Sequence, residues 1–229
     1  DDRYAFNMSI RGDGSNRFGQ NKSARFQPVW ALGFRWNMEM EPWMQNQNIV
    51  RGLNFQFSYG YQGNVVNNVS PFLIATIGTD PRTYDYTLTI KDLPAPDLKW
   101  EKTQNINYSI SGSLFDNKIS FNFNGYYKKT TDILTEMAGV GVLGEGGNRW
   151  INSGAMKNQG FEFNIGWNES LNKDLSYGVS FLGTYNKNEV IALGEGMQPI
   201  ESGTIHGGTY TSRTLAGYPI GGFWLIPTD

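Results

Sequence analysis

His206 is the single histidine of the chain, and the chain has no cysteine. His206 is therefore the first candidate for a catalytic group. A histidine that activates a serine nucleophile works with a serine on a sharp turn, and the sequence contains no Gly-x-Ser-x-Gly elbow. The absence of cysteine excludes disulfides, thiolate zinc sites and cysteine nucleophiles. We therefore expect His206 to lie in a surface loop rather than in a catalytic triad.

Acidic and glycine-rich stretches could hold a metal ion or a phosphate, but their spacing does not support either site. Gly144–Gly147 and Gly194–Gly196 lack the Lys-Ser/Thr pair of a phosphate-binding loop. Arg11-Gly12-Asp13 is best explained as a turn, because Asp and Gly favour turns. The sequence therefore predicts no enzyme, no metal site and no cofactor. Four aspartates share one long loop and could offer oxygen ligands to calcium, although without EF-hand spacing: Asp80, Asp85, Asp92 and Asp97.

The composition narrows the class of protein further. The 229 residues are 14% aromatic and 17% charged, with a formal net charge of −2. Disordered chains have few aromatics and a strong net charge, and nucleic-acid binders carry a basic stripe, so we expect neither disorder nor a nucleic-acid partner. Apolar runs reach only about five residues, too few for a transmembrane helix. Alternating transmembrane strands remain possible, because their hydropathy averages out.

Alternation of apolar and polar residues, the signature of β-strands, is the main pattern in the chain. It predicts an all-β fold with no substantial helix. Seven stretches show it, and an eighth begins near Gly217: Tyr4–Ile10, Phe26–Trp36, Leu53–Tyr61, Ile106–Leu114, Ile119–Tyr127, Phe161–Trp167 and Tyr177–Tyr185.

Long and short connections alternate between these stretches. Long loops are predicted at about 62–99, 132–157 and 187–216, whereas Asp116-Asn117 forms a tight hairpin turn. Short turns at one end and long loops at the other are typical of an antiparallel up-and-down barrel, in which the long loops are extracellular.

The two faces of the predicted strands differ in composition, and the difference indicates what each face contacts. A soluble sheet normally exposes many charged residues, but here Arg35 and Glu162 are the only charges on the polar face. Small neutral polar groups suit an enclosed lumen, and the opposite face carries aromatic residues near strand ends, as at membrane interfaces. A soluble β-sandwich with an aromatic core is the alternative. The residues predicted to face the lumen are Asn54, Gln56, Asn122, Asn124, Glu162 and Asn164.

Eight blocks of sequence along most of the chain are more specific than the alternation: Arg11–Gly19, Ser58–Asn64, Leu93–Thr103, Leu114–Lys118, Tyr126–Leu134, Asn152–Glu162, Tyr185–Val190 and Gly217–Phe223. The most specific block is Leu-Pro-Ala-Pro-Asp-Leu-Lys-Trp-Glu-Lys-Thr at 93–103. In their sequence and their order these blocks resemble the SusC/RagA-like TonB-dependent outer-membrane transporters of Bacteroidota.

This resemblance implies that residues 1–229 are an internal portion of a β-barrel domain, about seven to eight strands of a wall of 22 strands. The plug domain, the TonB box and the remaining strands would lie outside these residues. The implied function is TonB-dependent uptake of oligosaccharides or peptides across the cell outer membrane. The implied partners are a SusD-like surface lipoprotein, the TonB–ExbB–ExbD complex acting through the plug, the outer-membrane lipid, and a glycan or peptide ligand.

Two other functions fit the alternation alone: a soluble or surface carbohydrate-binding β-sandwich module, and a small structural or adhesive outer-membrane barrel. In the transporter interpretation the loops recognise the ligand or the lipoprotein, because aromatic rings offer a large contact area. Trp150 and Tyr86 are the leading candidates. The full set of predicted loop contacts is Phe72, Tyr84, Tyr86, Trp150, His206 and Tyr210.

Overall fold

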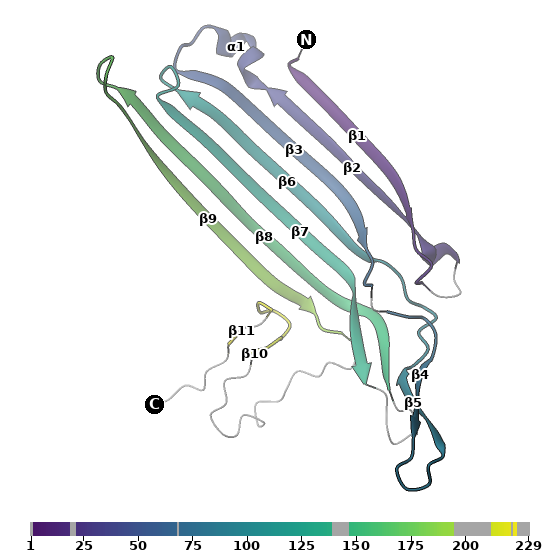
Figure 1. Cartoon of the computed structure of the whole chain (residues 1–229). Helices are drawn as coiled ribbons and strands as arrows, with labels where there is room; N and C mark the ends of the chain where they lie inside the picture. The colour runs from purple at the N-terminus through teal and green to yellow at the C-terminus, as the bar shows by residue number, and fades with distance from the viewer. Residues whose placement is uncertain are drawn as a thin grey trace.

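One large antiparallel sheet dominates the computed structural model, which describes residues 2–18, 22–67, 69–138, 147–194, 212–220 and 222–223. Figure 1 shows its long strands running side by side. Their bounds are β1 Tyr4–Gly14, β2 Phe26–Asn37, β3 Val50–Asn64, β6 Glu101–Leu114, β7 Ile119–Ala138, β8 Asn148–Ser170 and β9 Ser176–Ala192.

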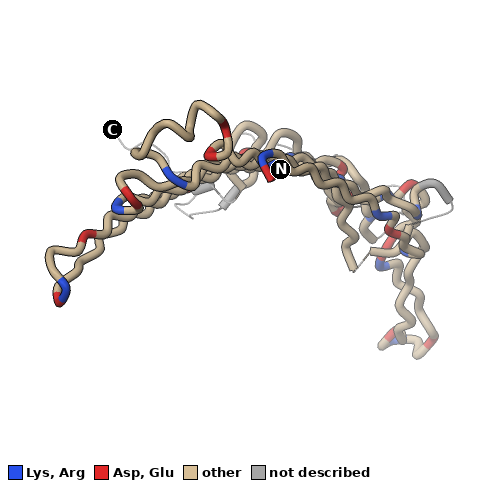
Figure 2. The backbone as a smooth tube through the Cα atoms, turned by 90° about the horizontal axis from the view of Figure 1, so that it is seen from above, with Lys and Arg blue, Asp and Glu red and all other residues tan. Residues whose placement is uncertain are grey.

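The strand order is β1-β2-β3-β6-β7-β8-β9, with every neighbouring pair antiparallel. Figure 2 shows that the sheet is an arc rather than a flat layer. A curved up-and-down sheet with no second sheet packed on its described face is a section of a barrel wall, and it excludes the β-sandwich. The predicted all-β barrel class is therefore confirmed.

All seven strands predicted from the alternation are present, and most of them are longer than predicted. The tight turn between β6 and β7 is also confirmed. Phe115, Asp116 and Asn117 have φ values of 55°, 53° and 67°, the left-handed region that Asp and Asn tolerate best. The alternation thus identifies the wall of the sheet correctly.

All three predicted long loops contain strand residues that the alternation did not reveal. The predicted loop at about 187–216 is corrected: β9 continues to Ala192, and Ser212–Arg213 is a short strand. The predicted loop at about 132–157 is corrected: β7 continues to Ala138 and β8 begins at Asn148. The pairing register shifts between Thr130 and Ile133, where Asp132 has a φ of 57°, and such a bulge breaks the alternation. The predicted loop at 62–99 contains a hairpin, β4 Ile74–Thr79 and β5 Tyr86–Asp92, whose last residue pairs in parallel with Asn148 at the start of β8.

The remaining elements are short. They are the 3₁₀ turns η1 (Lys22–Arg25) and η2 (Met38–Met40), the helix α1 (Pro42–Gln45), and the strand pair β10 (Ser212–Arg213) and β11 (Gly222–Phe223). The eighth strand predicted near Gly217 is a turn at that residue, whose φ is 86°. No helix in the described part of the chain is long and apolar enough to cross a membrane.

The buried apolar cluster lies beyond one end of the wall, among the long connections, and we call it the cap core. Its residues come from the β1–β2 connection, the segment between β3 and β6, and the start of the β7 extension. Trp150 and Val66 pack against it. The cap core therefore folds the long connections into a compact layer. Its buried members are Phe18, Val69, Ala95, Leu98, Trp100 and Leu134.

Candidate functional site

The residues predicted to face the lumen lie side by side on one face of the sheet. Asn124 on β7 is paired across the sheet with Ser109 on β6 and Glu162 on β8. Cross-strand partners project from the same face, so these polar side chains form continuous rows. This row continues to Gln56 and Arg35, and a second row is Asn37–Asn54–Ser111–Asn122–Asn164.

A hollow of about 970 Å³ extends across this polar face. It reaches from β1 to β8, and one hollow can span that many strands only on the concave side of the arc. The polar face is therefore the concave face. Polar side chains among its lining residues are Asn7, Arg35, Gln56, Asn124, Tyr126 and Glu162.

Tyr126 is a polar-face residue that the sequence prediction did not include. Its hydroxyl donates a hydrogen bond to Asn186 Oδ1 at 2.7 Å. Its ring lies over Gly160, where an added Cβ would come within 2.9 Å of the ring. A glycine opposite an aromatic residue is the signal that could have identified it, because the ring needs that space.

The convex face is lined with uncovered aromatic side chains. Phe123 and Phe163 stack with centroids 5.6 Å apart, and Phe161 stacks on Tyr185 at 5.5 Å. Many of these rings are exposed, for example Phe161 at 47%. A continuous exposed apolar surface of this kind marks a contact with another apolar phase or chain.

A buried carboxylate, Glu101, connects the cap to the wall. Glu101 Oε2 accepts a hydrogen bond from Asn64 at 2.7 Å, and Oε1 accepts one from the Leu134 backbone at 3.0 Å. The Asn152 side chain joins the same layer, because it accepts from the Lys99 backbone N–H at 2.9 Å and donates to the Lys99 and Asp132 carbonyls. These bonds fix the segment before β6 against β7 and β8.

A second cavity of about 610 Å³ lies in the cap. The segment Pro94–Lys99 forms one wall, and Arg149–Asn152 at the start of β8 forms the other. Trp150 lines this cavity while also packing on the cap core. The cavity combines an aromatic ring, backbone carbonyls and a guanidinium, which are groups that can hold a polar ligand.

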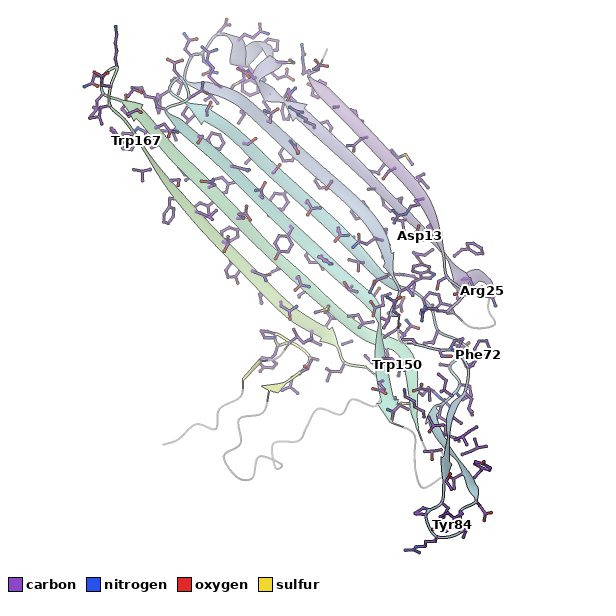
Figure 3. All side chains as sticks on the ribbon, viewed as in Figure 1. Asp13, Arg25, Phe72, Tyr84, Trp150 and Trp167 are labelled. Atoms are coloured by element: carbon purple, nitrogen blue, oxygen red, sulfur yellow. The ribbon has the colours of Figure 1, made fainter. Side chains whose placement is uncertain are left out.

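The predicted loop contacts do not form one cluster. Tyr84 and Tyr86 are 80% and 86% exposed at the end of the β4–β5 hairpin, and Phe72 lies just before β4. Figure 3 shows Tyr84 at the hairpin tip and Trp150 at the lower end of the wall. His206 and Tyr210 lie outside the described residues. Among the described residues, no group of three or more His, Asp or Glu side chains could hold a metal ion.

At the opposite end of the wall, Glu41 joins the first two strands. Glu41 Oε1 accepts hydrogen bonds from the Tyr4 hydroxyl at 2.5 Å and the Trp36 indole at 3.0 Å, and Arg3 lies 3.8 Å from Oε2. The hydrogen bond from Tyr4, followed by the one from Trp36, holds the pKa of the Glu41 carboxyl below its ordinary value. The ionised carboxylate thus stabilises this end of the sheet.

We expect Glu41→Gln to lower stability at neutral pH and to have little effect in acid. A carboxyl whose pKa is lowered on folding stabilises the protein fully above its unfolded pKa of about 4.3. That stability is lost as the pH falls through the lower, folded-state pKa. The check is the melting temperature of both proteins in full-length form between pH 7 and pH 3. A difference that stays constant with pH would instead indicate lost packing.

Comparisons with known proteins agree with this geometry. The sequence model of a family described as "TonB dependent receptor-like, beta-barrel" matches residues 1–224. TonB-dependent receptor P3 of Formosa agariphila is 30% identical over 207 residues, which are 85% of this chain and 19% of the relative. TonB-dependent receptor SusC of Bacteroides thetaiotaomicron is 26% identical over 198 residues, 83% of this chain and 20% of the relative.

Comparison with solved structures also finds proteins of similar fold. The RagAB peptide importer in the closed-closed state superposes with a TM-score of 0.74 at 26% identity, over 86% of this chain and 21% of that one. The open-open state gives a TM-score of 0.72. The chain thus spans only about a fifth of the length of the relatives it matches (19% and 20%).

The curved antiparallel wall, polar on its concave face and aromatic on its convex face, defines an outer-membrane β-barrel protein. More specifically, the chain belongs to the TonB-dependent receptor-like β-barrel family. The relatives P3 and SusC are themselves TonB-dependent receptors.

Proposed function

We propose that this chain is a section of the barrel wall of a nutrient importer of the outer membrane. The observation that carries the proposal is the contrast between the two faces of one curved sheet. The concave rows around Asn124 offer mainly neutral hydrogen-bonding groups, together with Arg35 and Glu162, along a path for a polar solute. The aromatic rings around Phe123, on the convex face, are suited to contact with the hydrocarbon core of a bilayer. In this orientation the polar face lines the lumen and the cap is extracellular.

The transport mechanism needs no bond chemistry from this wall. The cap captures the ligand at the extracellular mouth, TonB–ExbB–ExbD displaces a plug domain, and the ligand then passes along the polar rows. A SusD-like surface lipoprotein is the expected partner, because SusC is a relative of this chain. An oligosaccharide or peptide is the expected ligand, and the peptide class is supported by the likeness to the RagAB peptide importer.

Tyr86 and Trp150 remain the leading candidates for contact with the ligand or the lipoprotein. They would act in different ways. Tyr86 stands exposed on the hairpin and would approach a partner from outside, whereas Trp150 lines the cap cavity and would hold a ligand within it. Large aromatic side chains of this kind dominate many binding interfaces.

We expect Tyr86→Ala and Trp150→Ala, each in the full-length receptor, to weaken lipoprotein capture or ligand uptake about tenfold or more. The matched control is Thr87→Ala, since neighbouring residues on a strand project from opposite faces and Thr87 is also exposed. Uptake and affinity are measured with membranes carrying equal amounts of each receptor. Unchanged values for both variants, with barrel assembly intact, would refute these two assignments.

A further inference from the structure

We propose that Lys129, Lys157 and Lys187, on the convex face, bind the phosphate group of a membrane lipid. This lysine site belongs to three adjacent strands, β7, β8 and β9. The inference rests on the proposed orientation of the wall, in which the convex face contacts lipid. It adds a lipid-binding site to that wall and does not depend on which nutrient is transported.

The position of the lysine site matches the lipid headgroups. Along β7 the outward side chains change from Phe123 and Tyr127 to Lys129, and along β9 they change from Tyr185 to Lys187. Two residues advance about 6.6 Å along a strand, or about 5 Å along the membrane normal at the usual tilt of about 40°. The headgroup layer is about 5–7 Å thick on each side of the hydrocarbon, so the ammonium groups reach the phosphates.

The lysine site has more positive charge than its neighbours neutralise. Lys157 Nζ lies 2.9 Å from Glu189 Oε1, and Lys187 Nζ lies 3.7 Å from Oε2 of the same carboxylate. Among the residues that the structure describes, no carboxylate pairs with Lys129. Three lysines therefore share one glutamate.

Lys129 and Lys157 are also directly opposite each other across the sheet. Like charges in this arrangement destabilise a sheet unless an anion lies between or above them. Asp132, three residues after Lys129 on β7, is already engaged by Lys99 at 3.0 Å and Lys102 at 3.6 Å. Glu189, which also contacts Lys187, is thus the one carboxylate that pairs with this lysine pair among the described residues.

A second negative charge for Lys129 and Lys157 cannot come from a further strand beside β7 or β8. β7 is flanked by β6 and β8, and β8 is flanked by β7 and β9, so both sides of Lys129 and Lys157 are occupied. Gln104 on β6 is the other cross-strand neighbour of Lys129, and it is neutral. Among the described residues no further carboxylate pairs with these lysines, so the second anion approaches the convex face from outside, and in a membrane that anion is a lipid headgroup.

A phosphate suits this arrangement better than a carboxylate. It carries several acceptor oxygens, which can bond two ammonium groups from opposite sides, and lysine is a common phosphate ligand. Basic residues at a membrane surface each add about 1 kcal/mol to the binding of anionic lipid. The two lysines that oppose each other would together increase binding about 30-fold.

The test uses the full-length receptor in zwitterionic detergent and compares the variant pair K129Q/K157Q with the wild type. The probe is diphosphorylated lipid A, and its dephosphorylated form is the control lipid. Binding is measured by native mass spectrometry and by the rise in melting temperature. The matched protein control is K128Q, because Lys128 is the next residue of β7 and projects from the opposite face.

We expect the phosphorylated lipid to bind the wild type and K128Q equally, and K129Q/K157Q about 30-fold more weakly. Equal binding of the dephosphorylated lipid, an equal loss in K128Q, or competition by millimolar inorganic phosphate would overturn the lipid site. Failure of the wall orientation itself is detected separately, by arginine substitutions at the centre of β7, so the two proposals can fail independently.

Discussion

Replacing Trp100 with alanine should lower the stability of the cap by about 3–5 kcal/mol, the usual cost of removing a buried tryptophan. Trp100 is 6% exposed, and its ring packs on Phe18 at a centroid distance of 5.3 Å. It also fills the space beside Gly63, where an added Cβ would lie 3.0 Å from the indole. The loss should open the contacts that hold the segment 93–100.

Hydrogen exchange of the full-length receptor measures this effect in the cap itself, whereas global unfolding reports on the whole barrel. The amides of residues 93–103 and 133–138 should exchange faster in Trp100→Ala, while those in the middle of β7 stay protected. Tyr84→Ala is the control, because that ring is 80% exposed. Unchanged protection in the cap would show that the cap core does not hold the long connections together.

Replacing Phe123 with arginine should destabilise the barrel by about 2–4 kcal/mol, the cost of a cation at the bilayer midplane on a lipid-facing position. Phe123 is the midpoint of the outward apolar run on β7, from Ile119 to Tyr127, and stacks on Phe163. Unfolding by guanidinium in lipid vesicles, together with the yield of assembled barrel, provides the measurement.

Asn124→Arg is the matched control for the face assignment. Asn124 is the next residue on β7 and is paired with Glu162, so an arginine there gains a nearby carboxylate on the polar face. We expect it to cost much less than Phe123→Arg. If Asn124→Arg is the more destabilising of the two, the faces are inverted and the proposed lumen is wrong.

The wall could be predicted from the sequence because each strand has one apolar and one polar side. The pattern Phe121-Asn122-Phe123-Asn124 predicts both a strand and which residues lie on each of its two faces. The turn at Asp116-Asn117 was equally readable, since few residues adopt a positive φ. These features depend on residues that are close together in the chain.

The cap could not be predicted in the same way, because its structure depends on contacts between distant segments. Trp100 meets Phe18, and Glu101 bonds Asn64 and the Leu134 backbone. The bulge at Asp132 also breaks the alternation just where β7 leaves the aromatic band. The sequence after Asp132 therefore lacks the alternation, and the strand residues there are predicted to be a loop. The predicted contact residues consequently fall at two separate places in the structure.

The pairing of Asn64 with Glu101 has a consequence for how such receptors diversify. The chain leaves the wall after Asn64 and returns at Glu101, its direct cross-strand partner, so residues 65–100 form an excursion with both ends at one point. Closing a longer loop costs only about 0.6 kcal/mol for each doubling of its length. An excursion of different length or sequence can therefore be exchanged without shifting the register of β3 and β6. The hairpin within the excursion can therefore vary, while the segment 93–100 keeps its place in the cap core and the surrounding strands assemble in the same order.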